Sequence, residues 1–215
     1  MLMPGPYSRW PSSPEKRTVD IVGAGAALFV TAPIIAFAAL TTYALDRKNP
    51  FFAQQRVGLD GNLFTTYKLR TLKGEGDLGG PGQGVADPRA TRHGRLFRQL
   101  AIDELPQLWN ILRGDMSLVG PRPLTKYDEE VVVNKLEKPT SDIWLHARAL
   151  TKSGLVCAFA IESRSIAAQE RESKEFSLRR AELDINYAAE AVPTTDIKLC
   201  YSALKAALSR PAEHE

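Results

Sequence analysis

Two adjacent carboxylates, Asp103 and Glu104, lie in the part of the chain that is richest in chemically useful side chains, "LAIDELPQLWNILRGDMSLVGPRPL". They stand before an apolar run, with Pro106 close behind, so one interpretation is structural: an N-cap aspartate and an acid in the first turn of a helix. The alternative is functional. A helix dipole keeps such a carboxylate ionised, two carboxylates can hold Mg²⁺ together with phosphate oxygens, and an ionised aspartate beside a metal-bound phosphate can act as a nucleophile.

Basic residues surround these carboxylates in the sequence. Each could be a solvated surface charge, but Arg122 lies between Pro121 and Pro123, which stiffen its backbone on both sides. A guanidinium on a rigid loop suits recognition of a diphosphate. The basic candidates are Lys68, Arg70, Arg89, Arg92, Arg95, Arg98, Arg113 and Arg122.

The composition excludes several classes of function. A chain of 215 residues fits one main domain with an anchoring extension. The net charge of +3 has no basic block behind it, which argues against a nucleic-acid partner. Cys157 and Cys200 form no CxxC pair and suit a reducing compartment. Because these two cysteines are far apart in the sequence, neither a disulfide scaffold nor a zinc site is expected. The histidines are scattered, so a cluster of metal ligands is not expected either.

The elements that must position these side chains can be read from the hydrophobic pattern. Asp60-Gly61 is a hairpin turn signal between two alternating runs, which predict strands over 51–57 and 63–70. The glycine-rich stretch "KGEGDLGGPGQG" does not match a phosphate-binding loop and is interpreted as a surface loop that could order over a substrate. Helices are expected near 94–100, after 103, and over 125–136, 140–149, 162–190 and 195–208.

An apolar segment runs from Ile21 to Leu45 without a charged residue. As a straight helix it would be roughly 37 Å long, which exceeds a hydrocarbon core of about 30 Å. Pro33 near its middle removes a backbone hydrogen bond, and Thr31 could bond back to the chain beside it. Three interpretations compete: a kinked transmembrane helix, a signal peptide cleaved near "AFA", and a helix-break-helix hairpin that enters the membrane and returns.

The flanks of the apolar segment favour the hairpin. Lys16 and Arg17 precede it, and Arg47 and Lys48 follow it. Basic residues prefer the cytoplasmic side of a membrane. A crossing helix would put one of the two pairs on the opposite side, whereas a hairpin keeps both pairs on the cytoplasmic side. The stretch 195–208 is a second membrane candidate, since its apolar residues share one face of a helix; packing on the core is the default, and the membrane interface is the alternative.

Several stretches together resemble the bacterial sugar transferases, the small monotopic phosphoglycosyl transferases of cell-surface polysaccharide and glycoconjugate pathways. The resemblance covers about residues 16 to 205 and rests on "KRTVD", "RVGLDGNLFTTYKLRT", "DPRATRHGRLFRQLAIDELPQLWNILRGDMSLVGPRPL" and "LDINYAAE". It implies transfer of a phospho-sugar from a nucleotide diphosphate sugar, a UDP-sugar by expectation, to polyprenyl phosphate, with release of the nucleoside monophosphate.

The resemblance also implies roles for individual residues. Asp103 would attack the sugar-side phosphate and form a covalent phospho-sugar intermediate, and both Asp103 and Glu104 would hold Mg²⁺. Pro33 would break a re-entrant membrane helix. The residues expected to bind substrate phosphates or the donor are Lys68, Arg70, Arg98, Arg122 and Arg164.

One stretch departs from the family pattern. The family carries a segment like "RPGITGWAQVNGR", and the corresponding run here is "TKSGLVCAFAIESR", which keeps Gly154 and Arg164. This stretch is expected to shape the sugar or nucleotide pocket, so the sequence does not name the sugar. It is also the best argument for the alternative hypothesis, a membrane-anchored, non-catalytic binding subunit of the same pathway.

The sequence thus predicts an α+β protein that is mainly helical, with a small β-hairpin, a re-entrant membrane helix broken at a proline, and amphipathic interface helices. Residues 1–15 are expected to be a flexible tail, 16–48 the membrane helices, and 49–210 a cytoplasmic catalytic domain. The expected location is the cytoplasmic face of the inner membrane. Expected partners are the nucleotide diphosphate sugar, polyprenyl phosphate and membrane lipid but no nucleic acid; homo-oligomerisation is left open.

Overall fold

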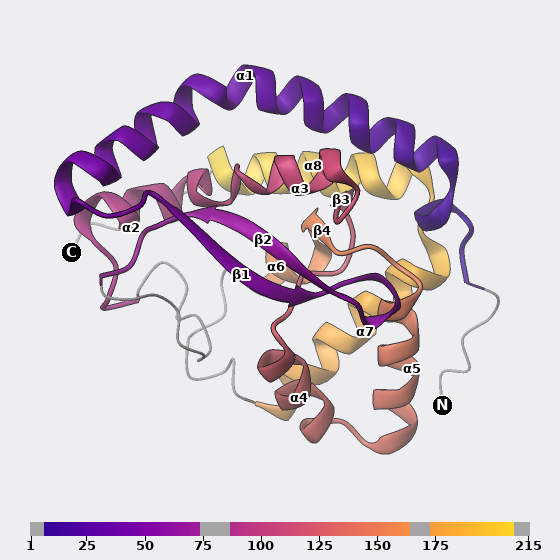
Figure 1. Cartoon of the computed structure of the whole chain (residues 1–215). Coiled ribbons are helices and arrows are strands. Elements are labelled where there is room, and N and C mark those ends of the chain that lie inside the picture. Colours follow the sequence, from indigo (N-terminus) through magenta and orange to yellow (C-terminus); the bar gives the residue numbers. More distant parts are fainter. Residues whose placement is uncertain (1–6, 74–86, 164–172, 209–215) are drawn as a thin grey trace.

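The computed structural model describes residues 7–73, 87–163 and 173–208. Within them the chain is mainly helical with one antiparallel hairpin, as the sequence predicts. It also has one short parallel pair of strands, which the sequence does not predict. In Figure 1 the long helix α1 (Pro14–Asp46) arches over the molecule, and the remaining helices and the hairpin lie beneath its concave side. This arrangement places the catalytic candidates under the arch.

The predicted break at Pro33 is wrong as a break, because α1 is one continuous helix with Pro33 inside it. Pro33 has no N–H to donate, and the expected back-bond is present beside it: the Thr31 hydroxyl donates to the Ala27 carbonyl over 2.7 Å. The helix is bowed rather than interrupted, and both of its ends turn toward the rest of the chain (Figure 1). By length and composition α1 is apolar enough to cross a membrane, since an 18-residue stretch within it has a mean hydropathy of 2.2.

Both halves of α1 contact the body of the protein. In the N-terminal half, Ala24 is fully buried in a cluster with residues of the helix α3 (Gln107–Arg113). In the C-terminal half, Ala38 packs with Leu69 and Phe97. The opposite face is exposed over its whole length, and its large apolar side chains are Val22, Phe29, Val30, Ile34, Phe37 and Leu40.

The N-terminal end of α1 is fastened by buried charges. Lys16 is only 2% exposed, and its Nζ lies 2.6 Å from Asp20 Oδ1, 2.6 Å from Ser117 Oγ and 3.2 Å from Asp196 Oδ2. Arg17 donates to the carbonyls at the end of α3, at 2.6 Å and 2.8 Å. These two residues are therefore docking residues, whereas the sequence suggested only basic flanks of a membrane segment.

The hairpin has the predicted boundaries to within one residue. Strand β1 (Phe51–Val57) pairs antiparallel with β2 (Leu63–Leu69), in a register that sets Phe51 opposite Leu69. The turn uses left-handed backbone at Asp60 (φ 55°) and Gly61 (φ 73°), which explains the Asp-Gly signal. Asn110 of α3 bonds along β2: its amide nitrogen donates to Thr65 O, and its amide oxygen accepts from Tyr67 N. The hairpin and α3 are therefore locked together.

A second strand pair carries the proline-rich loop. Strand β3 (Ser117–Val119) runs parallel to β4 (Gly154–Val156). A side chain at Gly154 would place its Cβ 2.1 Å from Gly120 N, and one at Gly120 would place it 2.3 Å from Lys152 O. Gly154 N also donates to Pro121 O over 2.8 Å. The glycine retained in the divergent stretch thus has a structural reason: it allows the loop with Arg122 to lie against β4.

The remaining helices form the main core and the C-terminal arm. Trp144 is fully buried among side chains from three of them, which supplies the largest apolar cluster. The short helix α6 begins after Cys157, whose sulfur accepts from Ala160 N and so acts as the N-cap. These helices are α2 (Arg92–Gln99), α4 (Lys126–Lys135), α5 (Lys138–Ala149), α6 (Ala158–Glu162), α7 (Lys174–Glu190) and α8 (Pro193–Leu208).

Helix α8 faces the other way from the default expectation. Its apolar residues Ile197, Tyr201 and Leu204 are 67%, 67% and 59% exposed, while Asp196 is buried against Lys16. The buried contact of Asp196 and the packing of Leu199 fix this helix to the body. The amphipathic interpretation is retained, but the face with Ile197, Tyr201 and Leu204 is exposed.

Two further expectations fall wholly or partly outside the described residues. The glycine-rich loop is described only at Lys73, and the long helix predicted over 162–190 is described as α6 and α7 on either side of residues 164–172. The predicted flexible tail is described from Tyr7 onward. That part packs against the body: Trp10 Nε1 donates to Asp196 Oδ2 over 3.0 Å.

Candidate functional site

Asp103 and Glu104 lie in a 3₁₀ turn, η4 (Ile102–Glu104), and do not begin an α-helix. Ala101 before them has a left-handed backbone (φ 56°), which turns the chain sharply out of α2. Helix α3 starts only at Gln107, with Pro106 at its N-cap position. The structural interpretation of Asp103 as an N-cap is therefore wrong, and the turn presents both carboxylates between α2 and the hairpin.

Glu104 is clamped by two cations. Its Oε1 lies 3.0 Å from Lys68 Nζ and 3.1 Å from Arg122 Nη2. Burial alone would raise the pKa of Glu104, but the charges of Lys68 and Arg122 outweigh burial and hold it well below its usual range. Glu104 in turn raises the pKa of Arg122. Lys68 from β2 and Arg122 from the proline-rich loop, far apart in the sequence, thus meet at one carboxylate oxygen.

Asp103 has the opposite environment. Its side chain is 9% exposed, and no hydrogen bond to its carboxylate occurs within the part of the chain that the structure describes. Burial, followed by repulsion from Glu104, raises the pKa of Asp103 to about 6, against the attraction of Lys68, Arg98 and Arg122. A helix dipole is not what sets its charge. At pH 7 the carboxylate is mostly ionised, and its oxygens are not engaged with a fixed partner.

Arg98 is near the dyad but anchored behind it. Its Nε donates to Thr71 Oγ1 over 2.9 Å, and its Nη1 lies 3.8 Å from Asp87 Oδ2. Asp87 is fully buried and is held mainly by Arg89, whose hydrogen bonds lower the pKa of Asp87. The beginning of the family-like block is therefore a support that orients Arg98, and Arg98 acts on Asp103 through its charge.

The other basic candidates do not reach the dyad. Arg70 lies just past the end of β2, and its Nε donates to Asn49 O over 2.9 Å. Arg92 and Arg95 are exposed on α2, and Arg113 pairs with Asp115 over 3.4 Å. The predicted site residue Arg164 lies outside the described residues. The structure thus brings together Lys68, Arg98 and Arg122 and leaves Arg70 at the margin.

A buried ion pair behind the proline-rich loop was not foreseen from the sequence. Arg148 Nη1 and Trp144 Nε1 both donate to Asp184 Oδ2 over 2.9 Å, and Arg148 Nη2 donates to the carbonyl of Arg122 over 3.1 Å. These side chains fix the backbone that carries the Arg122 guanidinium. The only sequence signal was the aspartate in "LDINYAAE", which the resemblance marked without assigning a role.

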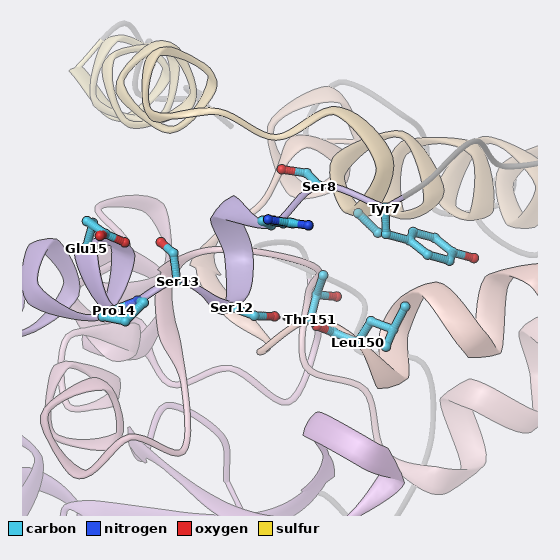
Figure 2. A pocket seen from close by; sticks show the side chains of 10 residues that line it. Tyr7, Ser8, Ser12, Ser13, Pro14, Glu15, Leu150 and Thr151 are labelled. Carbon is cyan, nitrogen blue, oxygen red and sulfur yellow. Dashed lines mark hydrogen bonds between the residues drawn. The ribbon is translucent and has the colours of Figure 1, made fainter.

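Two hollows differ in their suitability as a site. A small recess next to Glu104 is lined by polar and charged side chains from separate elements, among them Arg56, Thr66, Lys68, Gln107 and Arg122. The larger recess lies elsewhere, between the N-terminal segment and the end of α5, and its lining residues include Tyr7, Ser8, Ser12, Ser13, Leu150 and Thr151 (Figure 2). Because the convergent charges line the small recess, it is the candidate site.

The dyad fits part of a Mg²⁺ coordination sphere. Among the described residues Asp103 has no hydrogen-bond partner, and both clamps of Glu104 fall on Oε1, so oxygens of both carboxylates are available to a cation. In the described ranges no cluster of three or more carboxylate, histidine or cysteine ligands occurs. Mg²⁺ commonly takes one or two carboxylates and completes its shell with phosphate oxygens and water. The donor set matches that mode of binding.

Comparison with known proteins identifies several relatives. The chain is 44% identical over 129 residues to the UDP-glucose:undecaprenyl-phosphate glucose-1-phosphate transferase of Caulobacter vibrioides, a match that covers 58% of this chain and 48% of that protein. It is 33% identical over 205 residues to the galactosyl transferase CpsE of Streptococcus agalactiae, covering 90% of this chain and 42% of the relative.

A third relative extends the pattern. The undecaprenyl-phosphate glucose phosphotransferase of Komagataeibacter xylinus is 43% identical over 126 residues, which is 57% of this chain and 23% of that protein. The chain therefore spans less than half the length of these three relatives. The family model described as bacterial sugar transferase matches residues 12–210, nearly the whole chain. The chain belongs to the bacterial sugar transferase family.

Proposed function

We propose that this protein transfers a phospho-sugar from a nucleotide diphosphate sugar, a UDP-sugar, to polyprenyl phosphate and so initiates synthesis of a cell-surface polysaccharide or glycoconjugate. The observation that carries the proposal is the asymmetry of the dyad. Glu104 is clamped by Lys68 and Arg122, whereas Asp103 is buried, mostly ionised and unbonded within the described residues. A carboxylate in that state, surrounded by cations, is suited to attack a phosphate.

In the first half-reaction an Asp103 oxygen attacks the sugar-side phosphorus of the donor. The bond between that phosphorus and the bridging oxygen breaks, and the electron pair leaves with the nucleoside monophosphate. An aspartyl phospho-sugar remains on the protein. Lys68 and Arg122 neutralise the phosphate charge that would otherwise repel the attacking carboxylate.

In the second half-reaction a phosphate oxygen of polyprenyl phosphate attacks the same phosphorus and displaces Asp103. The Asp103 carboxylate is thereby regenerated, and the product is a polyprenyl diphosphate sugar. Mg²⁺ bound by Asp103 and Glu104 would supply further neutralisation of the donor diphosphate. The rigid Arg122 loop, backed by Arg148, holds one guanidinium in place through both steps.

The acceptor requires a membrane location. Both halves of α1 contact the body, so both of its ends lie on the side where the body lies. The exposed apolar face of α1 and the apolar face of α8 would then enter the bilayer, with the body at the cytoplasmic face of the inner membrane. The bow of α1, with both ends turned toward the body, supports a helix that dips in without crossing (Figure 1).

Turnover with a panel of UDP-sugars and polyprenyl phosphate tests the proposal. We expect release of UMP with at least one sugar, and no release when Asp103→Asn replaces the unaltered protein. EDTA should abolish turnover, excess Mg²⁺ should restore it, and Glu104→Gln should move the half-saturating Mg²⁺ concentration upward. Failure of every sugar in a folded, membrane-bound preparation would favour the alternative, a non-catalytic binding subunit.

Thiol labelling tests the membrane arrangement. In a Cys200→Ser background, single cysteines at Glu15 and Lys48, which are exposed beyond the two ends of the apolar segment, should respond alike to a membrane-impermeant reagent. Both should be protected in intact cells and labelled in inverted vesicles. Opposite responses at the two positions would show that α1 crosses the bilayer.

A further inference from the structure

Arg180 is a partly buried cation for which no hydrogen bond occurs among the residues that the structure describes. It lies on α7, with its guanidinium carbon 4.3 Å from the centre of the Phe159 ring and 5.8 Å from that of Phe176. Its Nε is buried and makes no hydrogen bond to any described residue. The neighbouring Arg179 is fully engaged, since it binds Glu162 and Glu182 over 2.7–3.0 Å. Stacking on aromatic rings does not satisfy the buried N–H of Arg180, a state that is costly unless an anion completes it.

A chain of contacts leads from the helix that carries Arg180 to the candidate site. One turn further along α7, Asp184 binds Arg148, which in turn binds the backbone of Arg122. Burial lowers the pKa of Arg180 to about 10; Asp184 opposes this effect, while the charges of Arg148 and Arg122 add to it. Three guanidiniums thus gather near Asp184, whose carboxylate is occupied by Arg148. The three guanidiniums together carry more positive charge than the single carboxylate of Asp184 neutralises.

The aromatic platform comes from the divergent stretch. Phe159 follows Cys157 in α6, which continues directly from β4, and β4 holds the proline-rich loop through the bond from Gly154 to Pro121. The rings of Phe159 and Phe176 pack edge to face with centres 4.7 Å apart. The guanidinium of Arg180 is therefore held by α6 and α7 on the side of the Arg122 loop that faces these helices.

We propose that Arg180 binds the nucleotide-side phosphate of the donor, the phosphate that departs with the nucleoside. This inference rests on the proposed function. The sugar-side phosphate must meet Asp103, where Lys68 and Arg122 already converge. When the bridging bond breaks, its electron pair passes to the oxygen of the leaving nucleoside monophosphate. A guanidinium with unpaired N–H groups next to the Arg122 loop is placed to receive that negative charge.

The test compares Arg180→Met with Arg180→Lys and with the matched control Arg179→Met. Methionine keeps the apolar stem over Phe159 but removes the charge. We expect Arg180→Met to raise the KM for the UDP-sugar and the inhibition constant of UMP by about ten- to a hundredfold, in parallel. Lysine should recover part of both. Arg179→Met removes only exposed ion pairs and should change neither.

Two readouts separate binding from packing. If Arg180 serves only to pack α6 against α7, Arg180→Met will lower the midpoint of thermal unfolding and leave the UMP constant unchanged, which would overturn the inference. The binding role predicts an unchanged or higher midpoint, because an unpaired buried charge is removed. A fall in kcat with an unchanged UMP constant would also overturn it, since that result would place Arg180 at the sugar-side phosphate.

Direct binding distinguishes failure of the inference from failure of the proposed function. UMP binding is measured by calorimetry on the Asp103→Asn protein with and without Arg180→Met, so no turnover is needed. Weaker UMP binding by the double variant, again by about ten- to a hundredfold, supports the anion site whatever the sugar. Equal binding by both proteins, or no UMP binding by either at millimolar concentration, rejects the site even if the unaltered protein turns over UDP-sugars.

Discussion

Two of the buried charged clusters in the described part of the chain, one at the foot of α1 and one at the dyad, are built in opposite ways. At the foot of α1, Lys16 contacts oxygens of Asp20, Ser117 and Asp196, and Asp196 also accepts from Trp10 and lies 3.0 Å from the Tyr187 hydroxyl. At the dyad, Glu104 has two cations, but no hydrogen bond to Asp103 occurs within the described residues.

We interpret the α1 cluster as a structural joint and the dyad as the proposed reaction site. Burying a charge is costly, and full pairing offsets most of that cost. In the α1 cluster every charge is paired, so removing one member leaves others stranded. At the dyad no hydrogen bond from a described residue offsets the cost of burying the Asp103 charge, and that carboxylate is therefore available for the proposed reaction. The comparison predicts that the first cluster governs stability and the second governs rate.

The largest expected effect is on turnover at the dyad. Asp103→Asn should lower kcat by about 10⁴-fold or more, because a covalent nucleophile is lost. The same change removes a buried charge without a bonded partner, so the midpoint of thermal unfolding should stay level or rise. UMP release and thermal unfolding measured on the same preparation check both halves. If Asp103→Asn is inactive because it is unfolded, the proposal that the dyad governs rate rather than stability is contradicted.

In the α1 cluster we expect the opposite result, a loss of stability with little change in turnover. Lys16→Met strands Asp20 and Asp196, and breaking a buried ion pair in this way should cost about 3–5 kcal/mol of the free energy of unfolding. Turnover per folded molecule should change by only a few-fold. Chemical denaturation in detergent measures the first quantity. Lys48→Met, at an exposed position, is the control and should shift stability by less than about 0.5 kcal/mol. If Lys16→Met were as stable as Lys48→Met, the structural role of the Lys16 cluster would be contradicted.

The smallest expected effect sharpens the comparison within the joint. Tyr187→Phe removes a hydroxyl that lies 2.9 Å from Val119 O and 3.0 Å from Asp196 Oδ1, which should cost about 1 kcal/mol of the free energy of unfolding. Burial, and next the charge of Asp196, raises the pKa of Tyr187 above 10 in the folded state. Its stabilising contribution is therefore present below pH 10 and is lost as the pH rises further. The variant should show a shallower loss of stability above pH 10 than the unaltered protein.

The sequence located the local elements and the dyad but not their long-range support. Alternation and the Asp60-Gly61 signal predicted the hairpin, because strand pattern and turn chemistry are local properties. The specific block around Asp103 and Arg122 predicts the candidate site by resemblance, and the structure brings Lys68, Glu104 and Arg122 together. Arg70 was expected there too, but β2 ends at Leu69 and the side chain turns to Asn49. A strand end is set by its neighbours and cannot be read from alternation alone.

The other differences also come from contacts between distant residues. The partners of Lys16 are Ser117 and Asp196, far along the chain, so a lysine next to an apolar run gave no sign of burial. The apolar face of α8 was expected to pack on the core, but the polar contact of Asp196 decides its orientation. At Pro33 the missing backbone N–H predicts the end of a helix, but in the structure it bows α1 without ending it.

Trapping the covalent intermediate tests the central claim most directly. The protein is mixed with its UDP-sugar donor in the absence of polyprenyl phosphate, quenched, and analysed by intact-protein and peptide mass spectrometry. We expect a mass increase of one phospho-sugar on the peptide that contains Asp103, with one equivalent of UMP released, and neither signal from Asp103→Asn. A phospho-sugar attached to another residue, or undiminished UMP release by Asp103→Asn, would contradict the role of Asp103 as the nucleophile.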